Sequence, residues 1–446
     1  MYIRTLALQN IKLLRDLRID FRKSSGEPRM WTVFVGENGL CKTTILQTVA
    51  LAASGPDRAN QLSDIVSLPD RRNEKEPARI TAEFDFGPLH QHEREYPKLP
   101  PDRAKETAAL GSYLTIRPGW NVFLGGSAFF DRGEPLGKWR DENLSHGEDP
   151  LQVARGRNLP HWFVAGYGVE RSLPQLQLAA LLTDNVLQRL NSLFGNGDLI
   201  GTGFADLLGS ADLVHQFSAR LQEALIPRLL PKISNLELRG RGGIRSAADM
   251  VESYRFDFHV ANRDVRVPAT WLSQGYQGLI AWVADLIGQQ FRDTQATPEL
   301  EKMEGLVLID ELDLYLHPTW QVLLVPRLKK VFPRLQFIVT THSPMLLPGF
   351  EREEIFMLRQ DAEGNVIAQP AEYSPMLMTG SEIYRVFFGV EGLYPTEAGD
   401  KLQRYGFLSS NPRRSDMDEQ EMTRLRSDLA ALGVEPNWKP VPREAR

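Results

Sequence analysis

The chain has 446 residues, of which 24% are charged and 42% hydrophobic, a composition typical of a globular protein with one large domain or two. The formal net charge of −5 excludes a uniformly basic nucleic-acid-binding surface and leaves only local patches for such contact. A single cysteine excludes an internal disulfide and favours a reducing cytoplasm. We see no secretory signal and no apolar run of membrane-spanning length, so we expect no membrane partner.

The first part of the chain predicts strands around one helix. Residues 2–21 alternate apolar and polar side chains on both sides of Asn10, which indicates two antiparallel strands with a bend. A buried strand over 31–36 and a helix over 42–53 follow, and then a strand over 78–86. Weak periodicity with scattered Pro, Gly and charge then predicts loops with an edge hairpin.

Later elements alternate between strand and helix. Strands are expected over 161–168, 235–240 and 254–260, with helices between 173 and 230. After Pro268 the pattern predicts a long helix over 273–291, a strand over 305–312, a helix over 318–331 and a strand over 335–343. Such alternation indicates a parallel α/β sheet.

The segment GENGLCKT, residues 36–43, follows the phosphate-loop pattern G-x-x-x-x-G-K-[ST] except at Cys41, where the second glycine is expected. Glycine suits a backbone that passes close to phosphate or adopts unusual dihedral angles. The lysine and hydroxyl of the loop are retained, so we expect nucleotide to bind still. The competing interpretation is a pseudo-ATPase that binds weakly.

Three further motifs are individually weak. Asp310 and Glu311 end an apolar strand, where they could support Mg²⁺ and activate water, or simply lead into a solvated turn. His342 ends another strand, where it could contact a γ-phosphate or simply cap the segment that follows. Ser273 and Gly275 open the long helix, whose free N–H groups attract phosphate; the plain alternative is an ordinary capped turn.

The motifs follow one another in a fixed order: the phosphate loop, the L-S-x-G segment, the acid pair at the end of an apolar strand, and the histidine at the end of another strand. Together they resemble an ABC-type ATPase head of the SMC/RecF/OLD kind. Three segments resemble the stand-alone ATPase subunits of bacterial anti-phage systems such as Septu and PARIS. They are LIDELDLYLHPTWQ (308–321), FIVTTHSPMLL (337–347) and YGVER (167–171). The resemblance covers about half of the chain.

The resemblance implies a fold and a domain organisation. The fold class is α/β, a P-loop ABC-type ATPase head with an inserted helical and β lid and a helical C-terminal tail. We expect an N-terminal ATPase lobe over 1–86, the lid over 87–267, the signature helix and acidic strand over 268–372, and the tail over 373–446.

The resemblance also implies roles for residues, with ATP and Mg²⁺ as cofactors. Thr43 and Asp310 would hold Mg²⁺, Glu311 would be the catalytic base, and His342 the γ-phosphate switch. Ser273 and Gly275 would contact ATP on a partner head, so hydrolysis would need a homodimer or higher homo-oligomer. The expected phosphate-loop contacts are Gly36, Asn38, Gly39, Cys41, Lys42, Thr43 and Thr44. Gln91 and Gln175 remain alternatives for the Q-loop glutamine.

The function implied is an ATPase that senses or scaffolds and controls a separate effector, a nuclease, in anti-phage defence. The alternatives are a RecF-like DNA-repair ATPase and a nucleotide-gated scaffold with negligible turnover. Arg239, Arg241 and Arg245 lie on a glycine-rich connection that could contact nucleic acid or form a solvated hairpin. The aromatic residues Trp271, Tyr276 and Trp282 are expected in the core. Lys12 and Arg15 are candidates for a basic residue that lies near the base of the bound nucleotide.

Overall fold

The computed structural model describes residues 1–73, 75–86, 108–117, 122–130, 162–173, 184–195, 199–208, 210–230, 232–238, 254–260, 263–294, 299–390, 396–436 and 439–442. It forms two compact units, residues 1–377 and 378–446. Gln91, Gln175 and the basic connection with Arg239, Arg241 and Arg245 lie outside the described residues.

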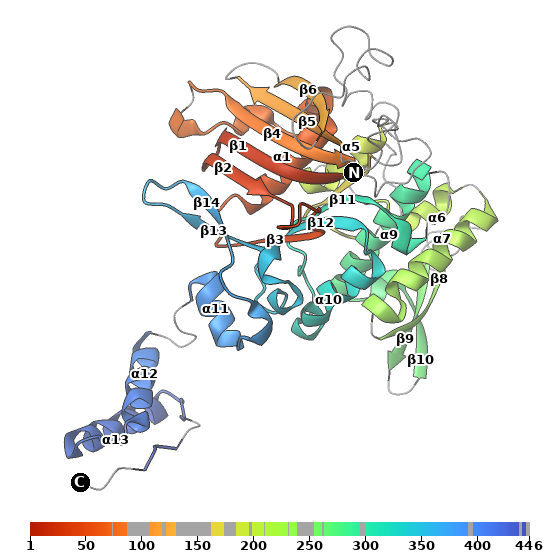
Figure 1. The fold of residues 1–446 in the computed structure, drawn as a ribbon. Coiled ribbons are helices and arrows are strands. Elements are labelled where there is room, and N and C mark those ends of the chain that lie inside the picture. The colour runs from red at the N-terminus through yellow and green to blue at the C-terminus, as the bar shows by residue number, and fades with distance from the viewer. Residues whose placement is uncertain are drawn as a thin grey trace. The chain divides into compact units, whose positions relative to one another are not determined.

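A six-stranded sheet forms the centre of the larger unit (Figure 1). Its strands, in spatial order, are β14 (Val366–Pro370), β13 (Ile355–Gln360), β3 (Trp31–Val35), β12 (Leu335–Thr340), β11 (Gly305–Ile309) and β7 (Val164–Tyr167). All neighbours pair in parallel except β14, which is antiparallel to β13. Strands β3, β12 and β11 are fully buried, because both faces are covered.

A second, antiparallel sheet has five strands. Their order is β2 (Leu14–Asp20), β1 (Tyr2–Ile11), β4 (Ala78–Phe86), β5 (Ala108–Ile116) and β6 (Val122–Phe130). The predicted bend between the first two strands is confirmed: Asn10 and Lys12 both have positive φ there. The predicted edge hairpin corresponds to β5 and β6.

Helix α1 (Lys42–Ser54) lies between the two sheets and has almost no exposed side chain. It contacts β4 and β5 on one side and β7, β11 and β12 on the other. Its run of Ile, Leu, Val and Ala fits a helix that is apolar all round. The residues immediately before α1 are therefore held on a rigid support. Gly55, with φ +97°, ends the helix, and α2 (Pro56–Leu62) begins at the next residue.

The inserted region and the signature segment pack together beside the central sheet. Helices α5 (Asn185–Leu190), α6 (Phe204–Leu207) and α7 (Ala211–Ala224) belong to this region, with the three-stranded sheet β10 (Arg263–Pro268), β9 (Tyr254–Val260) and β8 (Ile233–Leu238). The long helix α9 (Gln274–Thr294) packs against α6 and α7 (Figure 1). Helix α10 (Pro318–Val331) begins and ends where the sequence predicts.

The predicted aromatic core near α9 is partly wrong. Tyr276 and Trp282 are buried, but Trp271 is 76% exposed because it lies in the short turn before the helix. Its side chain therefore finds no place in the core of its own chain.

The smaller unit is helical, with α11 (Gly380–Phe388), α12 (Thr396–Ser410) and α13 (Asp416–Ala431). Reciprocal capping boxes start two of these helices, at Thr379 with Glu382 and at Ser415 with Asp418. Helices α12 and α13 share a small core of Tyr405, Leu408, Met422 and Leu429. Among the described residues, no helix has the length and apolarity needed to cross a bilayer.

Candidate functional site

The phosphate-loop segment connects β3 to α1 and wraps around its own lysine. The Lys42 ammonium donates to the carbonyl oxygens of Gly36 at 2.8 Å and Glu37 at 2.7 Å. Gly36 cannot carry a side chain, because a Cβ would lie 2.8 Å from the Leu358 carbonyl oxygen. Gly39 has φ +84°, a conformation that favours glycine, and Asn38 beside it is exposed. The loop thus presents its backbone outwards at the N-terminus of α1, as an anion site requires.

Cys41 is in the left-handed region, with φ +58° and ψ +23°. This conformation costs an ordinary residue roughly 1–2 kcal/mol, which is the physical reason that glycine is expected at this position. The half-buried Cys41 side chain packs against the core cluster between the sheets. The substitution therefore keeps the loop conformation at the expense of local backbone strain.

We expect Cys41→Gly to raise the free energy of unfolding by about 0.5–1 kcal/mol, because glycine relieves the left-handed strain while losing entropy in the unfolded chain. Binding of Mg²⁺–ATP should be at least as tight. Thermal unfolding and calorimetric titration measure the two effects. Cys41→Ala is the matched control, because it removes sulfur but keeps the Cβ and its strain. A marked loss of affinity in the glycine variant alone would contradict this account.

The Asp310 carboxylate connects the phosphate loop to the end of β12. One oxygen, Oδ2, accepts from the Thr43 hydroxyl at 2.7 Å, and the other, Oδ1, accepts from the Thr340 hydroxyl at 2.6 Å. Asp310 is buried, with 5% of its surface exposed. Three segments that are far apart in the sequence therefore meet at one carboxylate. Thr340 was not predicted as part of the site, although its place in the TTHS run was a signal.

Glu311 is held mainly through its backbone. Its N–H donates to the Thr340 hydroxyl oxygen at 2.7 Å, and its carbonyl oxygen accepts from Arg171 Nη2 at 2.5 Å. Its φ is +48°, so the chain turns sharply directly after Asp310. Thr341 donates to Asp313 and fixes the same turn from the end of β12. The side chain of Glu311 is half-buried and remains available for chemistry.

The titratable groups of the site influence one another. Burial, followed by the positive charge of Lys42, lowers the pKa of His342, while the nearby acids Glu311, Asp313 and Asp310 act in the opposite direction. Burial also lowers the pKa of Lys42, against the attraction of Asp310 and Glu311. The lowered pKa keeps His342 predominantly neutral at pH 7, so it can donate one hydrogen bond and accept another.

Thr44 takes a different position from the other loop residues. It is buried, and its hydroxyl accepts from the Lys12 ammonium at 3.2 Å. This hydrogen bond connects α1 to the turn between β1 and β2, where Lys12 has φ +47°. The Lys12 side chain is therefore at the phosphate-loop helix, close to the place expected for a basic residue near the nucleotide.

Ser273 and Gly275 line a separate, open cavity of about 640 Å³, together with Tyr315 and His317. A Cβ on Gly275 would collide with the Tyr315 carbonyl oxygen, so only glycine allows α9 to approach this turn so closely. Ser273 is exposed. Within the described ranges, the structure records no hydrogen bond between these residues and the phosphate loop. The lining of this cavity includes none of the phosphate-loop residues 36–43.

Oxygen donors suited to Mg²⁺ meet at the phosphate loop. The Thr43 hydroxyl and the Asp310 carboxylate are already within hydrogen-bond distance of one another, and both are hard oxygen ligands. Thr43 and Asp310 would hold a magnesium ion here, Asp310 directly or through water, and the ion would supply positive charge to bound phosphates.

Strands β3, β12 and β11 are neighbours in the central sheet. They are followed by the phosphate loop, by His342 and by the acid pair, respectively. This fold and this set of motifs are those of a P-loop ATPase head, and they resemble the ABC-type heads of the SMC/RecF/OLD-like branch.

Comparisons with known proteins agree with this class. The family described as "AAA domain, putative AbiEii toxin, Type IV TA system" matches residues 134–347. Septu protein PtuA of Bacillus mycoides is 25% identical over 96% of this chain and 50% of its own length. The Retron Ec83 probable ATPase of Escherichia coli is 35% identical over 29% of this chain and 22% of its own length.

The chain thus spans half or less of the length of these curated relatives. Among solved structures, the SmcHead bound to the C-winged helix domain of ScpA matches 83% of this chain and 98% of its own, with 16% identity and a TM-score of 0.46.

Proposed function

We propose that this protein binds ATP with Mg²⁺ and hydrolyses it at a site shared between two copies of the chain. The observation that supports this most directly is the pair of hydrogen bonds that joins Thr43 to Asp310 and Asp310 to Thr340. Glu311 is the residue directly after Asp310. This pair of hydrogen bonds brings a phosphate-binding helix terminus, metal-ligand oxygens and a candidate base together at one end of the sheet. Ligands of α/β proteins bind in this position.

The proposed roles follow from the geometry. Lys42 and the N-terminus of α1 bind the phosphates. Thr43 and Asp310 would hold Mg²⁺, which would neutralise phosphate charge when bound. Glu311 orients a water molecule for in-line attack and accepts its proton. His342, held neutral by burial and Lys42, donates a hydrogen bond to the γ-phosphate region and so distinguishes ATP from ADP.

We expect Glu311→Gln to reduce ATP turnover by about 100-fold or more, because an amide cannot accept the proton of the attacking water. ATP binding should be retained, since Lys42, Thr43 and Asp310 are unchanged. The variant should therefore accumulate as an ATP-bound dimer. Phosphate release measures the first effect, and size-exclusion chromatography with light scattering in ATP measures the second.

Glu304→Gln is a matched control for this variant. Glu304 is also a buried acid beside β11, but it precedes the strand and lies at the opposite end from Glu311. Its replacement should leave turnover unchanged. Unchanged turnover in Glu311→Gln itself would show that the acid pair has been assigned wrongly.

The separation of Ser273 and Gly275 from the phosphate loop supports a shared site. Both residues line a cavity beside the exposed side chains of Trp271 and Tyr315, which are 76% and 61% exposed. A second copy of the chain could present its bound nucleotide to this surface. Each nucleotide would then be enclosed by the loop of one copy and the signature residues of the other.

Mixing two inactive variants tests this arrangement. A dimer of Ser273→Arg and Lys42→Ala chains has one site with both defects and one with neither. Turnover should return on mixing, up to about half of the wild-type rate if the sites act independently. Full turnover per site by monomeric protein, verified by light scattering at high dilution, would exclude the shared site.

We further propose that ATP binding and hydrolysis control a separate effector protein, a nuclease, in anti-phage defence. The support is the similarity over nearly the whole chain to Septu protein PtuA and over part of it to retron ATPases.

A phage-plating assay tests the role in defence. In cells that carry the gene with its neighbours, Lys42→Ala should abolish protection, because it removes the phosphate-binding cation. Lys330→Ala, at an exposed position of α10, is the control for loss of a lysine and should protect fully. Full protection by the Lys42 variant would contradict an ATP-dependent role.

A further inference from the structure

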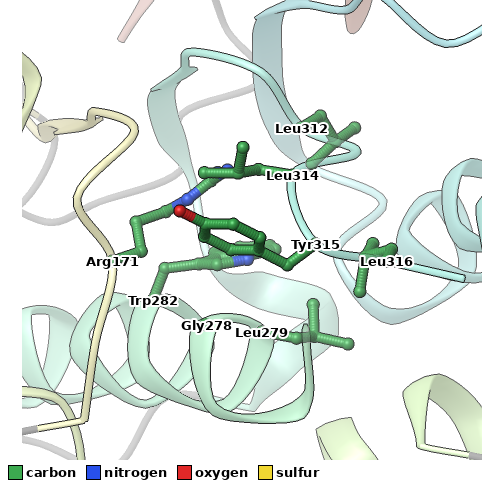
Figure 2. A pocket seen from close by; sticks show the side chains of 8 residues that line it. All are labelled: Arg171, Gly278, Leu279, Trp282, Leu312, Leu314, Tyr315 and Leu316. Atoms are coloured by element: carbon green, nitrogen blue, oxygen red, sulfur yellow. The ribbon is translucent and has the colours of Figure 1, made fainter. Parts of the chain in front are cut away.

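Arg171 lies in the segment that leaves β7 and has no role in the function proposed above. It is buried, with 8% of its surface exposed, in a small cavity between α9 and the turn of residues 311–316. Figure 2 shows its side chain pointing towards this turn, near Leu314 and Tyr315, with Trp282 of α9 also lining the cavity. The position is thus between the signature helix and the candidate base.

The guanidinium makes a short hydrogen bond to the turn. Its Nη2 donates to the carbonyl oxygen of Glu311 at 2.5 Å, and the same oxygen accepts from the N–H of Leu314 at 3.0 Å. Both acceptor positions of that carbonyl are therefore used. A carbonyl held in this way restrains the backbone of Glu311, and with it the direction of the Cα–Cβ bond from which its side chain extends.

Arg171 is charged in spite of its burial. Burial lowers its pKa to about 10, while Asp310, Asp313, Glu311 and Tyr315 act to raise it. It is therefore a cation at pH 7, beside three acids of the turn. The hydrogen bond of Nη2 to Glu311 and the attraction of these acids offset part of the cost of burying this charge, while Nη1 is buried without a hydrogen-bond partner in the described part of the chain.

The segment that carries Arg171 also contacts the signature helix. The Tyr167 carbonyl oxygen accepts from the Asp310 N–H at 2.9 Å, and the Tyr167 hydroxyl donates to Asp285 of α9 at 3.3 Å. Gly278 of α9 faces the Arg171 carbonyl oxygen, at 3.4 Å from where its Cβ would be. Residues 167–171 thus connect α9 to the two acids.

We propose that Arg171 is a positioning residue that holds the backbone of Glu311 in the conformation required for water activation. The inference rests on the proposed function of Glu311 as the base. Arginine suits this role because its planar, rigid donor group reaches the carbonyl oxygen from β7 and stays charged. Lysine can supply one donor and the charge, but not the same geometry.

The test compares Arg171→Met with Arg189→Met. Arg189 is another buried arginine of the same region, whose Nε donates to the Val164 carbonyl oxygen at 3.0 Å, away from the acidic turn. Hydrogen exchange, measured by mass spectrometry on the nucleotide-free protein, reports how often the backbone of the turn opens. Peptides that cover residues 311–316 should exchange faster in Arg171→Met and at the wild-type rate in Arg189→Met.

In turnover assays, Arg171→Met should lower kcat by about 10- to 100-fold, the range expected for a misplaced catalytic group. The Kd for Mg²⁺–ATP should stay unchanged, and Arg171→Lys should recover part of kcat. Arg189→Met should lower the thermal unfolding temperature without a comparable fall in kcat below that temperature. Wild-type exchange together with wild-type kcat in Arg171→Met would overturn the proposal.

A double variant separates this inference from the proposed function. If Arg171 acts through Glu311, adding Arg171→Met to Glu311→Gln should cause little further loss. An equal fold-loss in both backgrounds would overturn the positioning role alone. Full turnover in Glu311→Gln would instead overturn the assignment of the base, and the positioning role with it.

Discussion

The hydrogen bonds of the Asp310 carboxylate are the constraint on which the rest of the site depends. Each oxygen of this buried group has a hydroxyl partner, one from the helix after the phosphate loop and one from β12. A buried carboxylate without such partners would be costly, so the folded chain must bring Thr43, Asp310 and Thr340 together. The geometry needed to bind a metal–nucleotide complex is thereby imposed by the requirements of folding.

Much of this arrangement could be predicted from the sequence. The strand before Asp310 and the helix after Lys42 are marked by long apolar runs, and the carboxyl ends of parallel strands meet at one edge. Arg171 could not be assigned in this way, because its hydrogen bond to Glu311 joins residues 140 positions apart. Trp271 was placed wrongly because hydrophobicity alone does not show whether an aromatic side chain finds a partner within its own chain.

Cys41 illustrates a different limit. The motif reveals that a glycine is replaced, but the consequence depends on the backbone angle, which the sequence does not contain. The structure shows the left-handed conformation retained and the thiol packed against the core between the sheets. The departure from the motif therefore affects backbone energy first, and the position of Lys42 and Thr43 is preserved.

Helix α1 has neighbours on both sides, one from each sheet, and almost no exposed surface. A helix enclosed in this way cannot be lengthened, shortened or rotated without disturbing two sheets at once. A change in chain length is therefore tolerated best in surface connections away from this helix, where it leaves the geometry at the start of α1 intact.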